Sequence, residues 1–438
     1  MAASPEPHRI GLEAVPRRRW RIAVLLGTGV LVNYFDRVNL SVAGPALHRD
    51  FGLSAVGFGY LSGAFNWTYA ALQLPMGVFL DRFGVRTLGG IGALLWSLAS
   101  FGAAAAPGLR TFFSMRLLLG VGEAPTFPAY AKATGYWFPR HERSLATAVF
   151  DGAAKFGPAI GVLMMGILTA RFGWRLSFAA TGLISFLYFF AFWIVYRDPK
   201  ADRLLSSAER RYLAEGGAHP EAENRKPEGA PLGYLLQQRK VLGLVAGFFG
   251  YNYSFYLLLY WLPSYFSALH LDPLHSAFYT SVPWLVATAT DLLIGGWLVD
   301  TLIRRGARET VVRQTVLITG TSCGLAIAGA MSTQNPAVAV IWISVALGGL
   351  SAAAPVGWSI PSLIAPRDSV GRVGGILNFG NQVAGILAPV VTGYLAGSFS
   401  RAFGVAAILL LLGIVGYILL LGRIEPVPEP AEARHAPA

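Results

Sequence analysis

Four charged side chains lie in the middle of segments that are otherwise apolar. Asp36 and Arg37 are adjacent in the stretch NYFDRVNL, residues 33–40, and Arg116 and Glu123 stand seven residues apart in RLLLGVGEAPTFPA, residues 116–129. Because seven residues are two helical turns, Arg116 and Glu123 share one helix face. Inserting a single charge into a membrane costs on the order of 3 kcal/mol. Charged residues that are this costly to bury in apolar segments predict a functional site.

The chemistry of these four residues suits a site that binds an anion and carries a proton. The guanidinium of Arg37 carries a permanent charge and a fork of donors that matches a carboxylate. Asp36 and Glu123 are candidate proton carriers, because a carboxylate in a low-dielectric cavity gains affinity for protons when an arginine leaves it. We expect two ion pairs across the first and fourth apolar segments, Asp36 with Arg116 and Glu123 with Arg37. Two static structural pairs are the alternative.

A third charged pair occurs in FDGAAKFGPAIG, residues 150–161. Asp151 and Lys155 stand four residues apart and can pair on one helix face. Two interpretations of Lys155 remain open. It binds a second anionic or polar end of a ligand, or Asp151 neutralises it as part of the structure.

The composition of the chain shows which elements must position these charges. Of the 438 residues, 54% are hydrophobic and only 13% are charged, about half the charged fraction of an ordinary soluble protein. Apolar runs of roughly 20 residues, the length that crosses a bilayer as a helix, recur twelve times. They lie at about residues 22–46, 55–79, 88–106, 110–136, 144–170, 174–195, 241–268, 276–299, 311–332, 336–362, 372–398 and 402–422. The sequence therefore predicts an all-α membrane protein with twelve transmembrane helices.

The distribution of basic residues predicts the orientation in the membrane. With the N-terminus in the cytoplasm, 26 of the 35 Lys and Arg residues lie in cytoplasmic segments, as the positive-inside rule requires. The opposite side carries only Arg49, Arg110, Arg171, Arg175 and Arg401. The net charge of +12 therefore reflects topology and does not indicate nucleic-acid binding. We expect a multi-pass protein of the cell inner (plasma) membrane with both termini cytoplasmic, whose first span is retained because no cleavage site follows it.

One long polar stretch divides the spans into two sets of six. We take residues 1–196 as an N-terminal half, 197–240 as a cytoplasmic linker and 241–438 as a C-terminal half. A short repeat supports a duplication: GVFLDRFGVR, residues 77–86, and GWLVDTLIRR, residues 296–305, share Gly, Asp and Arg at an offset of 219 residues. Parallel repeats are one of the known transporter architectures.

The first repeat resembles the signature loop of the major facilitator superfamily, and the second is similar to its weaker copy. The resemblance implies two six-helix halves of the major facilitator architecture and a charged cytoplasmic gate. The gate residues would be Asp81, Arg82, Arg86, Asp300 and Arg305. Gly77 and Gly84 are expected to permit close helix packing and a tight turn. The alternative is that the charges only obey the positive-inside rule.

Three further segments narrow the resemblance to the anion:cation symporter family, which includes bacterial sugar-acid transporters. They are NYFDRVNLSVAGP in the first span, GFGYLSGAFNWTYAALQLPMG in the second and RLLLGVGEAPTFPA in the fourth. The resemblance implies that Arg37 binds the substrate carboxylate and that Asp36 and Glu123, with Arg116, couple transport to protons. The sugar-acid transporters tend to carry neutral Asn and Gln near Lys155, so this chain departs from them there.

Other polar residues in the spans are candidates for substrate contacts. Asn378 and Asn381 match the family stretch in which an asparagine binds substrate, with a helix–helix hydrogen bond as the alternative. Further candidates for the cavity wall are Tyr34, Tyr69, Gln73, Tyr253 and Ser359. For the tyrosines, packing or anchoring at the membrane interface is the alternative. Asp291 in the eighth span is expected nearer the cytoplasmic gate.

Together, the residues and the resemblance predict a proton-coupled symporter that imports a small organic anion by alternating access. The anion would be a sugar acid or a related hydroxy or dicarboxylic acid. An anion exchanger or uniporter without proton coupling is the first alternative, and a membrane sensor that binds an anion without moving it is the second.

The expected partners are a small carboxylate substrate, protons and the lipid bilayer, and we expect the chain to act as a monomer. No enzyme activity, cofactor or metal is expected. Cys323 is the single cysteine, and the linker lacks the phosphate-binding motif G-x-x-x-x-G-K-[ST]. The sequence leaves open the identity of the substrate, the number and order of protons, and the oligomeric state.

Overall fold

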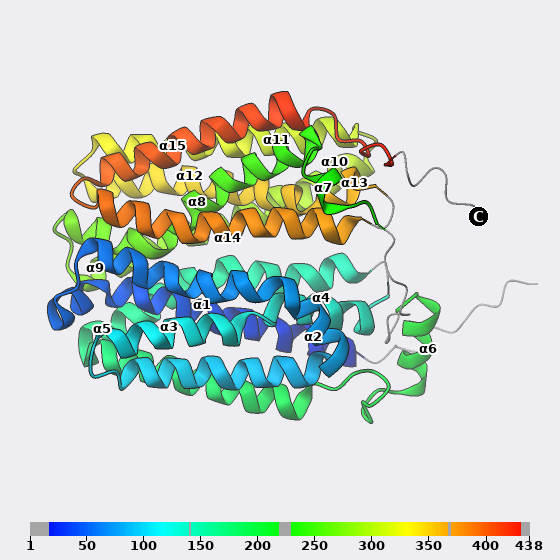
Figure 1. The fold of residues 1–438 in the computed structure, drawn as a ribbon, viewed down its shortest axis with the longest axis horizontal. Coiled ribbons are helices and arrows are strands. Elements are labelled where there is room, and N and C mark those ends of the chain that lie inside the picture. Colours follow the sequence, from blue (N-terminus) through cyan, green and yellow to red (C-terminus); the bar gives the residue numbers. More distant parts are fainter. Residues whose placement is uncertain (1–16, 140–141, 219–228, 367–368, 431–438) are drawn as a thin grey trace, which may run out of the picture.

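A computed structural model describes residues 17–139, 142–218, 229–366 and 369–430. Within these ranges every regular element is helical, and the long helices run side by side (Figure 1). The first part of the chain forms α1 Arg18–Phe51, α2 Ala55–Ala104, α3 Leu109–Glu123, α4 Thr126–Trp137 and α5 Arg143–Val195. Two short helices follow, α6 Ser207–Glu215 and α7 Leu232–Leu235.

The second part of the chain contains the remaining helices. It begins with α8 Arg239–Ala268, α9 Pro273–Thr290, the π-helix η2 Asp291–Leu298 and α10 Val299–Arg304. It continues with α11 Glu309–Gly324, the 3₁₀-helix η3 Leu325–Ser332, α12 Pro336–Ser359 and α13 Pro361–Ile364. It ends with α14 Val370–Leu395, α15 Phe399–Val415 and the π-helix η4 Gly416–Leu421.

These helices make the twelve expected passes in two halves, which confirms the predicted fold class. Gly84, at φ +76°, and Gly173, at φ +81°, turn α2 and α5 back on themselves, so each of these long helices makes two passes. Both glycines adopt a backbone conformation that residues with a side chain rarely adopt. In the described chain, eight helical stretches are long and apolar enough to span a membrane by themselves, one of them being both passes of α5. The three remaining passes are not among these eight stretches: α1, the first pass of α2, and α3 with α4. They carry most of the charged side chains that are predicted to be functional.

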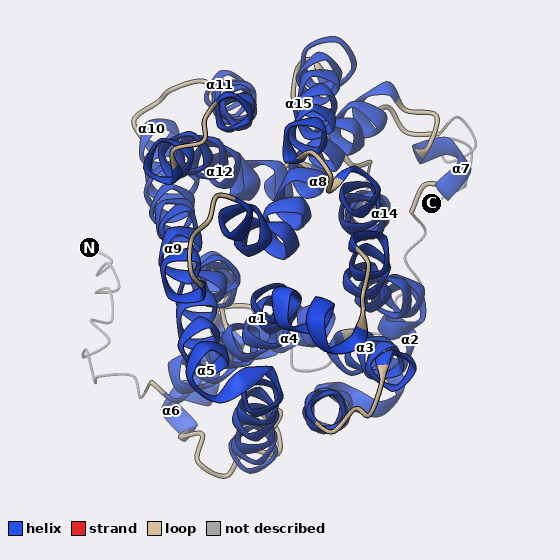
Figure 2. Ribbon diagram, turned by 90° about the vertical axis from the view of Figure 1, so that its left-hand side faces the viewer, coloured by secondary structure: helices blue, strands red, loops and turns tan. Residues whose placement is uncertain are grey.

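The two halves pack against each other through glycines on α2 and α14. A Cβ atom at Gly59 would lie 2.5 Å from the carbonyl oxygen of Pro389, and one at Gly393 would lie 2.6 Å from that of Ala55. Small residues at such positions allow the backbones of membrane helices to approach closely. Figure 2, which looks along the helices, shows α1, α2 and α5 facing α8, α9 and α14. These contacts lie on the side away from α6 and α7, which we call the opposite side; the side that carries α6 and α7 is the linker side.

Towards the linker side, α2 and α14 separate. Gly77 lies four residues after Gln73 on the same face of α2, and Gly374 lies four residues before Asn378 on α14. No atom lies within 4 Å of a Cβ built at either glycine. The close packing expected at Gly77 is therefore absent in this conformation, whereas the turn expected at Gly84 is present.

The helix α6 is fastened to the start of α1 by ion pairs. Arg19 contacts Glu209 of α6 at 3.0 Å and Glu142 at 2.7 Å, and the Glu209 side chain is fully buried. Burial alone would lower the pKa of Arg19, but its hydrogen bonds with the two glutamates raise that pKa overall. Arg19 thus stays charged and holds α6 against the first half.

Candidate functional site

An ion pair between α1 and α3 lies at the centre of the candidate site. Arg37 donates a hydrogen bond from Nε to Oε2 of Glu123 at 2.8 Å, and its Nη2 lies 2.7 Å from the same oxygen. Both residues are buried, Arg37 at 3% exposure and Glu123 at 0%. The guanidinium also lies over aromatic rings, 4.8 Å from the ring centre of Tyr34, 4.5 Å from that of Phe65 and 5.5 Å from that of Tyr69. Such cation–π contacts position a cation without neutralising it.

Asp36 does not pair with Arg116, so that part of the predicted arrangement is wrong. Its carboxylate accepts hydrogen bonds from Ser100 at 2.5 Å and from Ser185 at 2.8 Å. Arg116 donates instead to the main-chain oxygen of Asp36, at 3.4 Å. Neighbouring helix residues point about 100° apart, and because Arg37 points to α3, Asp36 points towards the second passes of α2 and α5. Nothing in the sequence pattern singles out the two serines that hold it.

Arg116 and Glu123 both have polar atoms without a partner. Nε and Nη2 of Arg116, and Oε1 of Glu123, are buried and make no hydrogen bond with the described residues. Arg116 is 1% exposed. Tyr256 and Tyr260 of α8, which the sequence analysis did not identify, lie within electrostatic range of Arg37 and Arg116, respectively. The site therefore lies between the halves and retains unused donors and an unused acceptor.

Lys155 lies between two carboxylates. Its Nζ is 2.8 Å from Oδ2 of Asp151 on the same helix and 3.4 Å from Oδ1 of Asp291, at the start of η2 in the other half. Asp291 is 4% exposed and pairs with Lys155 across the halves, a contact that the sequence did not predict. The two residues are in different halves, so no local spacing in the sequence indicates this contact.

Hydrogen bonds between side-chain amides connect α2, α8 and α14. Asn252 donates to Oδ1 of Asn381 at 2.8 Å, and Nδ2 of Asn381 is buried without a partner in the described chain. Asn378 donates to Oε1 of Gln73 across the halves at 3.4 Å, and Gln73 donates to the carbonyl oxygen of Ala124 at 3.2 Å. Asn381 and Gln73 are thus placed on facing halves, with Tyr34 and Tyr69 at Arg37.

Ser359 is engaged elsewhere. Its hydroxyl donates to the carbonyl oxygen of Val356 and accepts a hydrogen bond from Arg313 of α11, both at 2.6 Å. Ser359 is the last residue of α12, at its linker-side end. Its partner Arg313 is not one of the predicted site residues. Its position gives no support to the predicted contact with substrate.

The predicted gate residues do not bridge the halves in this conformation. Asp81 pairs with Lys132 of α4 at 2.5 Å, and Arg82 lies over the ring of Phe83. Arg86 donates to the carbonyl oxygen of Trp193 at 3.2 Å. Asp300 and Arg305 in the other half are both exposed. Their arrangement agrees with the separation of α2 and α14 on the linker side.

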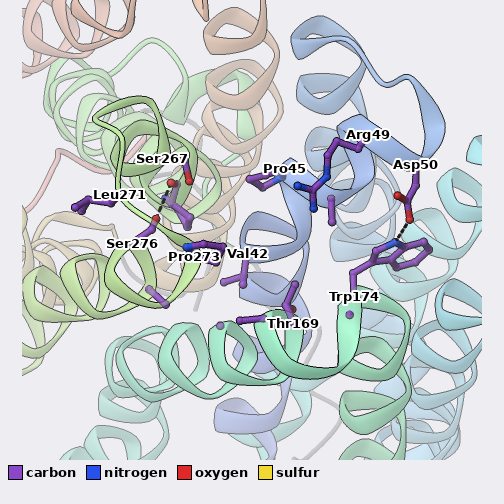
Figure 3. A pocket seen from close by; sticks show the side chains of 16 residues that line it. Val42, Pro45, Arg49, Asp50, Thr169, Trp174, Ser267, Leu271, Pro273 and Ser276 are labelled. Carbon is purple, nitrogen blue, oxygen red and sulfur yellow. Dashed lines mark hydrogen bonds between the residues drawn. The ribbon is translucent and has the colours of Figure 1, made fainter.

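A cavity of about 420 Å³ lies on the opposite side, between α1 and α5 of one half and α8 and α9 of the other (Figure 3). Arg49, Asp50 and Trp174 line it, and Trp174 donates from its indole nitrogen to Asp50 at 2.6 Å. None of the predicted site residues lines this cavity. A second cavity, of about 340 Å³, lies around Asp81 and Lys132.

Comparison with known proteins identifies relatives along nearly the whole chain. The chain is 41% identical over 414 residues to the uncharacterized transporter YybO of Bacillus subtilis, covering 93% of this chain and 95% of that protein. It is 32% identical over 420 residues to a D-galactonate transporter of Escherichia coli, covering 94% and 97%. It is 33% identical over 427 residues to the probable galactarate/D-glucarate transporter GarP of Escherichia coli, covering 93% and 95%. These relatives confirm the resemblance to sugar-acid transporters.

The fold has a counterpart among solved structures. A bacterial homolog of the human lysosomal transporter Spinster superposes with a TM-score of 0.75 at 16% identity, covering 93% of this chain and 97% of that one. The profile of the Major Facilitator Superfamily matches residues 26–331 and 304–438. Because the match, the relatives and the fold all extend over both halves, the chain belongs to the Major Facilitator Superfamily, a family of membrane transporters and not of enzymes.

Proposed function

We propose that the chain is a proton-coupled symporter that imports a small organic anion by alternating access. The observation that carries this proposal is the pair of Arg37 and Glu123. A buried guanidinium whose fork contacts only one oxygen of one carboxylate can bind a second carboxylate in its place. Arg37 is thus proposed to bind the substrate, and Glu123 is the acid that must respond when substrate arrives.

The proposed substrate is a sugar acid or a related hydroxy or dicarboxylic acid. Two relatives are named for the transport of galactonate and of galactarate or glucarate, which combine carboxylates with several hydroxyl groups. The unpartnered Nδ2 of Asn381 and the side chain of Gln73, on facing halves, suit the hydroxyl groups. Tyr34 and Tyr69 are proposed to keep Arg37 in position through their rings.

Charge balance supports coupling to protons. Asp36, Arg37, Arg116 and Glu123 are all at most 3% exposed, and their formal charges cancel. An anion that enters this site adds an uncompensated negative charge, which costs several kcal/mol in a low-dielectric interior. A proton on Glu123 removes that charge at the moment when Arg37 turns to the substrate. We propose the same role for Asp36, which Ser100 and Ser185 hold near the main-chain contact of Arg116.

Alternating access is supported by the helix pair α2 and α14. The pair is packed at Gly59 and Gly393 and open at Gly77 and Gly374. If the linker side is cytoplasmic, as the basic residues predict, this conformation opens to the cytoplasm. The gate residues Asp81, Arg82, Arg86, Asp300 and Arg305 would then approach one another only when that side closes. We keep the half boundaries at residues 196 and 241 and the monomeric state as part of this proposal.

Transport by purified protein in liposomes tests the proposal. Vesicles with an inside-alkaline pH gradient are mixed with labelled galactonate or galactarate, and accumulation is compared with vesicles at equal pH. We expect accumulation that depends on the gradient and is lost in Arg37→Gln, but not in the exposed control Arg21→Gln. Exchange of labelled for unlabelled acid without gradient-driven accumulation would contradict proton coupling and favour an exchanger. Binding without any flux would favour a sensor.

A further inference from the structure

Lys155 and its two carboxylates form a charged cluster that the proposed mechanism does not use. The ammonium group lies 2.8 Å from Asp151 and 3.4 Å from Asp291. The side chains of Lys155 and Asp291 are 5% and 4% exposed, whereas that of Asp151 is 30% exposed. One cation therefore faces two acids, and the cluster has a formal charge of minus one when both acids are ionised.

The groups around Asp291 do not supply the missing positive charge. Tyr251 of α8 interacts with all three charges of the cluster, and Tyr34 of α1 interacts with Lys155 and Asp151. The helix α12, which packs against η2 through Ala352 and Pro355 at Gly295, has no ionisable residue between Pro336 and Ser359. Within the described chain, Lys155 is thus the only cation that forms an ion pair with either carboxylate.

The two carboxylates are not equivalent. Asp151 accepts a hydrogen bond from Lys155 and is partly exposed, so its charge is well stabilised. Asp291 has its Oδ1 atom buried without a hydrogen bond, and that oxygen lies farther from Lys155 than the Oδ2 of Asp151 does, 3.4 Å against 2.8 Å. A buried carboxylate without hydrogen bonds is the one that takes up a proton when negative charge accumulates nearby. The π-helix that begins at Asp291 is a rare form that occurs frequently at functional sites.

We propose that Asp291 is a proton-binding residue of the transport cycle, separate from Asp36 and Glu123 and located in the other half. This inference rests on the proposed symport. When Asp291 is ionised, its attraction to Lys155 joins η2 to α5 and so links the halves. When an anionic substrate enters, Asp291 binds a proton, the cluster becomes neutral, and the link between the halves is released. Each transported anion is then accompanied by one proton more than the pair of Arg37 and Glu123 requires.

The proton-to-substrate ratio tests this proposal. In liposomes with fixed substrate and pH gradients, the membrane potential at which net flux is zero gives the ratio. We expect Asp291→Asn to lower the ratio by about one, because Lys155 and Asp151 then form a neutral pair without a proton. Asp291→Glu should restore the wild-type ratio. Glu309→Gln, which removes an exposed partner of Arg313 at the start of α11, should leave the ratio unchanged.

A second variant keeps the test decisive if Asp291→Asn is poorly folded. Asp151→Asn leaves Asp291 to pair with Lys155, so the cluster is again neutral without a proton and the ratio should again fall by about one. Flux should also be slower than in Asp291→Asn, because no proton then releases the link between the halves. An unchanged ratio in both Asn variants would overturn the role of Asp291. If the wild-type protein itself moves no protons with substrate, the symport proposal fails first, and the result is distinct because the ratio is then zero without any substitution.

Discussion

Glu123→Gln separates the two roles that the pair of Arg37 and Glu123 would combine. If Arg37 binds the substrate carboxylate as proposed, the carboxylate of Glu123, which lies 2.7–2.8 Å from the guanidinium, competes with it. The amide of glutamine has the same size but neither charge nor titration. The variant therefore loses the competitor, while Arg37 keeps its contacts with Tyr34, Phe65 and Tyr69.

The expected magnitude follows from the burial of the pair. Removing one partner of a buried pair costs about 3–5 kcal/mol, because the other charge remains uncompensated. A substrate carboxylate that binds Arg37 restores the compensation, so part of this energy returns as affinity. Each 1.4 kcal/mol corresponds to about a tenfold change. We expect Glu123→Gln to be less stable without ligand and to bind the acid roughly ten- to a hundredfold more tightly.

Calorimetric titration of detergent-purified protein with galactonate at two pH values measures this effect. Asp36→Asn is the contrast, because Asp36 is held by Ser100 and Ser185 and is not the partner of the Arg37 side chain; it should tighten binding much less than Glu123→Gln does. Gradient-driven accumulation should be lost in Glu123→Gln even though binding is tighter. Binding that is weaker than or equal to wild type would refute the competition between Glu123 and substrate.

Three further outcomes are expected. Arg37→Lys should weaken binding at least tenfold with near-normal expression, since an ammonium cannot replace a bidentate fork, and titration with the same acid checks it. Arg19→Met should reduce stability by up to about 3–5 kcal/mol, because it leaves buried Glu209 without its cationic partner; the exposed control Arg21→Met should change the melting temperature little. Gly77→Leu should fold and bind substrate, yet slow net transport strongly, because the added side chain would block the closing of α2 on α14; wild-type flux in this variant would count against that closure.

The fold was predictable because apolar runs of membrane length are a direct physical requirement, and they marked every pass. The pairing of Arg37 with Glu123 was predictable as well, since a buried guanidinium needs an acid and few spans carry one. The partners of Asp36 were not, because serines donate hydrogen bonds at almost any position in a helix and follow no spacing. The contacts of Ser359 were not predictable for a related reason: residue type does not tell whether a hydroxyl faces a cavity or a neighbouring helix.

The contacts of Lys155 show a second limit of prediction from sequence. Spacing indicated its contact with Asp151, because both lie on one helix face. The contact with Asp291 depends on how one half rests on the other in a particular conformation. A local pattern carries no information about such a contact.

The unfilled space at Gly77 and Gly374 has a consequence for engineering this protein. A Cβ atom added there has no atom within 4 Å in the present conformation, and replacing glycine in a helix by residues such as alanine or leucine generally favours the folded chain. A screen for heat-resistant variants would therefore select such substitutions and enrich proteins fixed in one conformation. Variants of this kind would suit structure determination and ligand titration, whereas a growth selection on the transported acid would remove them. Comparing the two selections at these positions would separate the residues needed for folding from those needed for turnover.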